Sequence, residues 1–110
     1  MKIDLKLPTQ AFVIISATLQ PIYKSKLLTR KEKSILSIAL DVVSKIEAKT
    51  VSIKKQATLF DEKKTIKITF KHHEADMLEL LLIQQIQYVD DNYFKIKIQK
   101  TINTLNQKLA

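Results

Sequence analysis

Two short segments in which apolar and polar residues alternate place the strongest constraint on how this chain can fold. Each segment, residues 2–7 and residues 65–71, carries three apolar residues at every second position. They are Ile3, Leu5 and Leu7 in the first segment and Ile66, Ile68 and Phe70 in the second. A period of two with one apolar face predicts a half-buried strand. Because a lone strand leaves its edges unpaired, we expect the two to pair in a small sheet covered by helices.

Most of the remaining sequence has the apolar spacing of helices. Residues 11–20 are apolar on nearly every side, which predicts a helix that is central in a core or covered by a partner subunit. Pro8 suits an early helical position, and Thr9 suits the cap at the start of this helix. Pro21 should end or kink the helix, because proline lacks the backbone donor that a helix needs.

A capping box marks the start of the next helix. Thr29 and Glu32 have the spacing at which the two residues satisfy each other's free backbone donors. The helix that follows is the most clearly amphipathic one in the chain and runs to about residue 49. Its apolar stripe consists of Ile35, Ile38, Ala39, Val42 and Ile46.

Two further helices follow the second alternating segment. The first runs from about His73 to Val89 and is dense in Leu and Ile. Asp90, Asp91 and Asn92 then form a turn that ends in a helix cap. The last helix has apolar residues at intervals of three or four, namely Phe94, Ile98, Ile102, Leu105 and Leu109.

Two stretches allow more than one structure. In residues 50–64, Val51 and Ile53 alternate like a short strand, but the preceding helix can also continue through them. Residues 61–64 form a polar turn before the second strand. Residues 93–98 also alternate, so a strand is an alternative to the start of the last helix there.

These patterns predict a single α-rich α+β domain over residues 1–110, with two short strands and about four helices. Its halves are similar in pattern: Ile3-x-Leu5-x-Leu7 precedes Gln10-Ala11, and Ile66-x-Ile68-x-Phe70 precedes Glu74-Ala75. This similarity is either coincidence or a tandem strand-helix-helix repeat over residues 1–49 and 65–110. The pattern and the Lys- and Ile-rich composition resemble small uncharacterised proteins of Bacteroidota and their phages. The resemblance implies no activity and favours a phage-type accessory protein.

The composition excludes many enzyme classes. The chain has no Cys and no Gly, which removes thiolate metal sites, cysteine nucleophiles and glycine-dependent phosphate loops. His72, His73 and Glu74 are the best candidates for a metal site, but adjacent residues do not share a helix face. Glu74, Asp76 and Glu79 fit a solvated helix face better than an acid–base set. We therefore expect a non-enzymatic protein with no catalytic residue, no metal and no cofactor.

Positive charge is concentrated in one part of the chain. The net charge is +8, and residues 1–55 hold 11 Lys or Arg against four Asp or Glu. The densest cluster falls at the start of the second helix, where the macrodipole disfavours cations but free N–H groups favour an anion. We hypothesise a phosphate site there, against the alternative of a Lys-rich solvated surface. Its residues are Lys24, Lys26, Arg30, Lys31 and Lys33, with Tyr23 stacking on a base, and Lys45 and Lys49 if the fold brings them near.

Two functions follow from these features. The first is binding of a phosphate-bearing anion, either nucleic acid or a nucleotide signal, by a phage-type accessory or sequestering protein. The alternative is a protein-interaction or structural module that docks through its apolar helices. Helices that are apolar on most sides also predict a homodimer or higher oligomer. The N-terminal residues lack a signal peptide's apolar region and no apolar run reaches about 20 residues, so we expect a cytoplasmic protein without a membrane segment.

Overall fold

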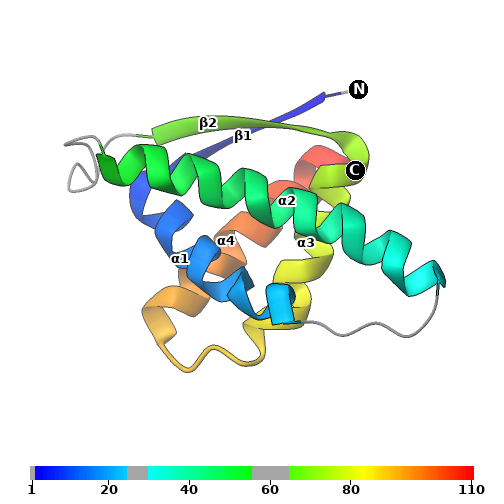
Figure 1. Ribbon diagram of the computed structural model, residues 1–110. Coiled ribbons are helices and arrows are strands. Elements are labelled where there is room, and N and C mark those ends of the chain that lie inside the picture. Colours follow the sequence, from blue (N-terminus) through cyan, green and yellow to red (C-terminus); the bar gives the residue numbers. More distant parts are fainter. Residues whose placement is uncertain (1, 25–29, 56–64) are drawn as a thin grey trace.

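The computed structural model describes residues 2–24, 30–55 and 65–110 of the chain (Figure 1). In chain order the elements are β1 (Lys2–Pro8), α1 (Thr9–Leu19), the 3-10 helix η1 (Gln20–Lys24), α2 (Arg30–Lys55), β2 (Thr65–Lys71), α3 (His72–Ile86) and α4 (Asn92–Leu109). The described part therefore contains four α-helices and one two-stranded antiparallel sheet. This architecture confirms the predicted α-rich α+β class.

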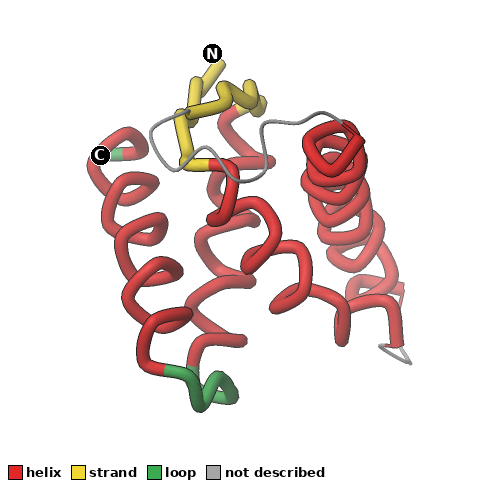
Figure 2. Tube along the Cα trace, turned by 90° about the vertical axis from the view of Figure 1, so that its left-hand side faces the viewer, coloured by secondary structure: helices red, strands yellow, loops and turns green. Residues whose placement is uncertain are grey.

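The two predicted strands pair with each other along their whole length. Leu5 lies opposite Ile68 at the centre of the antiparallel register. Leu5 and Phe70 are completely buried, and the alternate positions of both strands face away from the core. Figures 1 and 2 show the sheet lying across one side of the helical body. Within the part of the chain that the structure describes, helices therefore cover one face of the sheet and leave the other open.

Helix α1 lies at the centre of the fold. It contacts α2, α3 and α4. Phe12, Ile15 and Leu19 on this helix are buried in the shared core. At these positions α1 has no polar side because helices of the same chain cover it. Of the two predicted alternatives, a central helix and a helix covered by a partner subunit, the first therefore holds for these residues.

The ends of α1 are set by its two prolines. The helix begins at Thr9, and Pro8 occupies the cap position with an extended backbone (ψ of 151°). The prediction that Thr9 is the cap is therefore wrong, because the last extended residue of β1 is also the residue before the helix. After Leu19 the chain continues as η1, which contains Pro21. The predicted end of the helix near this proline is therefore confirmed.

Helix α2 is a continuous helix of 26 residues. It begins at Arg30, immediately after the predicted capping residue Thr29. Thr29 itself and the side chain of Glu32 lie outside the described residues, so the capping box stays a prediction. The predicted polar turn at residues 61–64 also lies outside them.

The end of α2 settles the first ambiguous stretch. Residues up to Lys55 are helical, so the strand alternative at Val51 and Ile53 is wrong. Ile53 continues the buried stripe of the helix, whereas the Val51 side chain is exposed. The buried Thr50 hydroxyl lies 2.8 Å from the carbonyl oxygen of Ile46 and 3.2 Å from that of Phe12, which ties α2 to α1. Packing against α1 therefore favours the helix over the strand.

Helix α3 follows β2 without a break. It begins at His72 and ends at Ile86, three residues before the predicted end. A Glu74 carboxylate oxygen accepts a hydrogen bond from the Lys71 backbone N–H at 2.8 Å. This bond closes the first turn at the sheet end of the helix, as expected for an acidic residue near a helix start.

Helix α4 follows the predicted capped turn. The Asp91 side chain accepts a hydrogen bond from the Phe94 backbone N–H at 3.0 Å, which confirms the cap. The strand alternative for residues 93–98 is wrong, because this segment forms the first turns of α4. Ile98 and Leu105 are completely buried against the rest of the core, and burying this stripe needs helical spacing.

Candidate functional site

The predicted phosphate cluster is only partly placed by the structure. Arg30, Lys31 and Lys33 lie in the first turn of α2, and all three are exposed. Lys26 and the side chain of Lys24 lie outside the described residues. The described part of the cluster is therefore a group of three cations at a helix start.

Two other lysines of the predicted set lie far from this cluster. Because α2 is continuous, the helical rise of about 1.5 Å per residue separates Lys33 from Lys45 by about 18 Å. Lys49 lies one turn beyond Lys45 on a similar side of the helix. The fold does not bring these two lysines round to the start of α2.

Tyr23 is also engaged elsewhere. Its hydroxyl donates a hydrogen bond to a Glu47 carboxylate oxygen at 2.9 Å and lies 3.4 Å from the Ser44 hydroxyl. Along α2, Ser44 lies about 21 Å and Glu47 about 26 Å from Arg30. Tyr23 therefore fastens η1 to the middle of α2, and the predicted set of eight residues splits into separate groups.

The open face of the sheet carries a set of lysines that the sequence analysis did not single out. The register places Lys2 directly opposite Lys71 and Lys6 directly opposite Lys67. All four side chains are exposed. Like charges directly opposite each other on neighbouring strands lower the stability of a sheet. Because two such pairs lie on one small face, their presence is not explained by a contribution to the stability of the sheet.

These four lysines form the corners of a rectangle on the open side of the sheet, which we call the lysine face. Cross-strand neighbours are separated by about 5 Å. The step from Lys2 to Lys6 spans about 13 Å along the strand. Asp4 and Thr69 lie opposite each other at the centre of the rectangle. The lysine face therefore spreads its positive charge over an area instead of focusing it at one point.

The centre of the lysine face holds the one acidic side chain of the two strands. The Thr69 hydroxyl donates a hydrogen bond to Asp4 Oδ1 at 2.7 Å. This bond, together with the charges of nearby lysines, holds the pKa of the Asp4 carboxyl below its ordinary value. Asp4 is therefore a carboxylate at neutral pH, and the five charged side chains carry a net charge of about +3.

A fifth lysine, Lys45 of α2, lies beside one end of the sheet. Lys2, Lys71 and Lys45 line a cavity of about 320 Å³ together with residues of β2 and the first turn of α3. The Lys45 ammonium lies 3.6 Å from a Glu74 carboxylate oxygen and 5.0 Å from the centre of the Phe70 ring. These contacts hold Lys45 beside the sheet. Lys45 of the predicted set thus lies beside the end of the sheet, next to the inward-facing Phe70, and not at the start of α2.

The carboxyl that holds Lys45 is itself shaped by its surroundings. Burial raises the pKa of the Glu74 carboxyl, but the hydrogen bond from the Lys71 N–H and the charge of Lys45 outweigh this effect. The pKa of Glu74 therefore lies below its ordinary value. Glu74 thus binds the Lys45 ammonium and the Lys71 backbone N–H at the end of the sheet.

Alternation alone did not single out the lysine face, for a physical reason. Lysine at the outward positions of a half-buried strand is ordinary, because those positions face water. Only the pairing register shows that two lysines of β1 meet two lysines of β2. The available signal was that both alternating segments place lysine at two outward positions.

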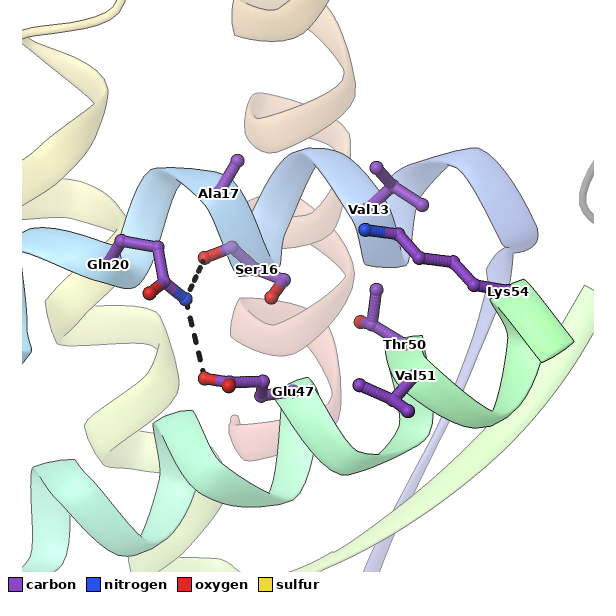
Figure 3. Close-up of a pocket in the computed structure, with 8 residues that line it drawn as sticks. All are labelled: Val13, Ser16, Ala17, Gln20, Glu47, Thr50, Val51 and Lys54. Atoms are coloured by element: carbon purple, nitrogen blue, oxygen red, sulfur yellow. Dashed lines mark hydrogen bonds between the residues drawn. The ribbon is translucent and has the colours of Figure 1, made fainter.

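A separate groove runs between α1 and α2 (Figure 3). Two neighbouring cavities, of about 330 and 380 Å³, share Glu47 and Val51. The apolar lining includes Val13, Ala17 and Val51, with Lys54 at the edge. Gln20 bridges the groove by donating to a Glu47 carboxylate oxygen at 3.4 Å. Because the polar groups of Ser16, Gln20 and Glu47 bond to one another, the groove resembles a packing seam more than a charged ligand site.

Other classes of site have little support in the described residues. Residues 2–24, 30–55 and 65–110 contain no group of three His, Asp or Glu side chains placed to hold a metal ion. In the same ranges, none of the helices combines the length and the apolar character that crossing a bilayer requires. Comparison with known proteins finds no matching family model, no similar curated protein and no similar solved structure.

Proposed function

We propose that this protein is a non-enzymatic binder of a phosphate-bearing polyanion, and that the lysine face is its principal contact surface. The observation that carries the proposal is the double pairing of Lys2 with Lys71 and Lys6 with Lys67. A bound row of phosphates offsets the repulsion within both pairs. The net charge of +8 adds long-range attraction for any polyanion.

The shape of the lysine face favours a polymer over a single nucleotide. The corners of the rectangle are about 13 Å apart along the strands, which exceeds the size of one phosphate group. A small nucleotide signal is better held in an enclosed pocket with converging polar groups. The cavity beside Lys2 and Lys71 is one end of this extended surface. A nucleic-acid backbone, with phosphates at regular intervals, matches a spread-out set of cations.

The test compares binding of labelled DNA, RNA and free nucleotides at two salt concentrations for three charge-matched variants. Lys6→Gln/Lys67→Gln removes half of the lysine face, and Arg30→Gln/Lys31→Gln removes two cations at the start of α2. Lys95→Gln/Lys100→Gln makes the same charge change on exposed positions of α4. We expect the first variant to bind polymers most weakly and to lower the salt slope by about two, since each lost phosphate contact contributes about 0.9.

Each other outcome has a definite meaning. Loss of binding only in the Arg30→Gln/Lys31→Gln variant places the anion site at the start of α2, as the sequence hypothesis has it. Binding of one free nucleotide without binding of polymers supports a sequestering role. An absence of polyanion binding at low salt overturns the proposal and leaves the positive charge as a general surface property.

A second candidate function, docking of proteins through an apolar helix, is favoured by the outer side of α3. Leu80 and Ile83 lie about one turn apart, and each is about half exposed (48% and 50%). We take a second copy of the chain as the occupant to test, which also tests the expected homodimer. Sedimentation at high micromolar concentration should show self-association that Leu80→Gln/Ile83→Gln removes. A monomer at that concentration contradicts this candidate.

A further inference from the structure

We infer that the sheet acts as a β-ribbon that enters the major groove of duplex DNA. The inference rests on the proposed function, because it takes the lysine face as the contact surface. It adds the kind of nucleic acid and the way in which the protein meets it. Three features carry it: the position of the sheet, the arrangement of its charges and the acid at its centre.

The sheet is placed where a groove can receive it. It consists of two strands only, and it lies on the outside of the helical body with one open face (Figures 1 and 2). Paired strands are about 5 Å apart. The major groove of B-form DNA is about 12 Å wide and 8.5 Å deep and admits a two-stranded ribbon. A two-stranded sheet therefore matches the groove in width, whereas a broader sheet does not.

The charges are distributed about the centre of the ribbon. Lysines stand at the four corners, on both strands and toward both ends. In a ribbon that lies in the groove, these corners are nearest to the two phosphate backbones that border it. Their flexible ammonium groups can reach phosphate oxygens on both sides, or the O6 and N7 atoms of guanine.

The position of Asp4 favours binding in a DNA groove over binding of phosphates alone. A carboxylate in the middle of a surface that binds only phosphates repels the ligand. At the centre of a groove it faces base edges instead, and the exocyclic amino group of cytosine is a donor that a carboxylate accepts. A carboxylate has several acceptor positions, so the bond from Thr69 leaves Asp4 able to accept another.

Other nucleic acids fit this surface less well. The major groove of duplex RNA is deep and narrow, and side chains cannot read it. Proteins that bind single strands stack bases on aromatic side chains. The outward positions of β1 and β2 carry Lys, Asp, Thr and Pro, with no aromatic residue. Duplex DNA is therefore the nucleic acid that both the shape and the composition of the ribbon favour.

The experiment measures binding of the full chain to four probes at about 150 mM salt. They are a 20-base-pair DNA duplex, the RNA duplex of the same sequence, the single DNA strand and inorganic polyphosphate. We expect the DNA duplex to bind at least about tenfold more tightly than the RNA duplex. Methylation of guanine N7, which lies in the major groove, should interfere with binding. A minor-groove ligand should not displace the protein.

A pair of matched variants tests the role of Asp4. Asp4→Asn removes the central charge, and Asp41→Asn removes an exposed carboxylate on α2. In selection from a pool of random duplexes, we expect the wild-type chain and Asp41→Asn to enrich the same short sequence. Asp4→Asn should lose that enrichment while its binding to polyphosphate is unchanged or stronger. A thermal melt of each variant checks that the fold is intact.

The outcomes separate this inference from the proposed function. Equal affinity for the DNA duplex, the RNA duplex and the single strand, without interference from N7 methylation, overturns the major-groove inference and leaves the proposed function standing. Binding to none of the four probes overturns both. Retention of the same enriched sequence by Asp4→Asn contradicts the role assigned to Asp4.

Discussion

Lys6 lies directly opposite Lys67 on the open face of the two-stranded sheet. Both side chains are exposed, so the repulsion between them is screened by solvent but acts at the shortest cross-strand distance. Asp4 and Thr69 form the next pair on this face, one hydrogen bond apart. The sheet thus carries a charge pattern that lowers its stability at low salt.

The first prediction concerns the free energy of unfolding. Lys2→Gln should raise it by a few tenths of a kcal/mol at low salt, because the substitution removes the like-charge pair with Lys71 and leaves the lysines that act on Asp4 in place. The gain should shrink as added salt screens the pair in the wild-type protein. Urea unfolding at about 10 mM and 300 mM salt measures both effects. Lys95→Gln on α4 is the matched control, and an equal salt response in the two variants contradicts the assignment.

The second prediction concerns the free energy of unfolding at low pH. The pKa values of Asp4 and Glu74 both lie below their ordinary values in the folded protein, so the unfolded chain binds more protons as the pH falls. Their stabilising contribution is complete above about pH 5 and is lost as the pH drops through the folded pKa of each group. Unfolding measured between pH 6 and pH 3 should show a smaller loss for Glu74→Gln than for the wild type. Identical slopes would show that Glu74 is not responsible.

The third prediction concerns the contact between α1 and α2. Thr50→Val keeps the shape of the side chain but removes the buried hydroxyl that reaches the carbonyl oxygens of Ile46 and Phe12. We expect a loss of about 1 kcal/mol in the free energy of unfolding, because a buried hydrogen bond is removed. Thr50→Ser keeps the hydroxyl and serves as the control. Greater stability of the valine variant than of the serine variant would argue against a role for the hydroxyl.

The fourth prediction concerns the start of α4. Asp91→Ala should lower the free energy of unfolding by about 1 kcal/mol, because the Phe94 N–H loses its capping acceptor. Asp91→Asn retains a good capping side chain and should cost less. Chemical denaturation of both variants at neutral pH gives the comparison. If the two substitutions cost the same, the charge at the helix start matters more than the cap.

Several features that depend on neighbours in sequence were predicted correctly, although the Thr9 cap of α1 was not. The period-two segments became β1 and β2, and Asp91 became a helix cap, because both features depend on contacts within a few residues. The stretch at Val51 and Ile53 was ambiguous because two alternate apolar residues fit a strand as well as a helix. Contact between Thr50 and α1, which are distant in sequence, favours the helix there.

At the candidate site, the difference between what the sequence indicated and what the tertiary structure decided is larger. Composition and local pattern were enough to indicate an α-rich domain, its two strands and a surplus of positive charge. They could not show that Lys2 and Lys6 face Lys71 and Lys67, or that Lys45 lies beside the end of the sheet and not at the start of α2. Alternation determines which face of a strand is buried, but register between strands about 60 residues apart is decided by packing of the whole core. Only the tertiary structure therefore placed the lysines on one surface.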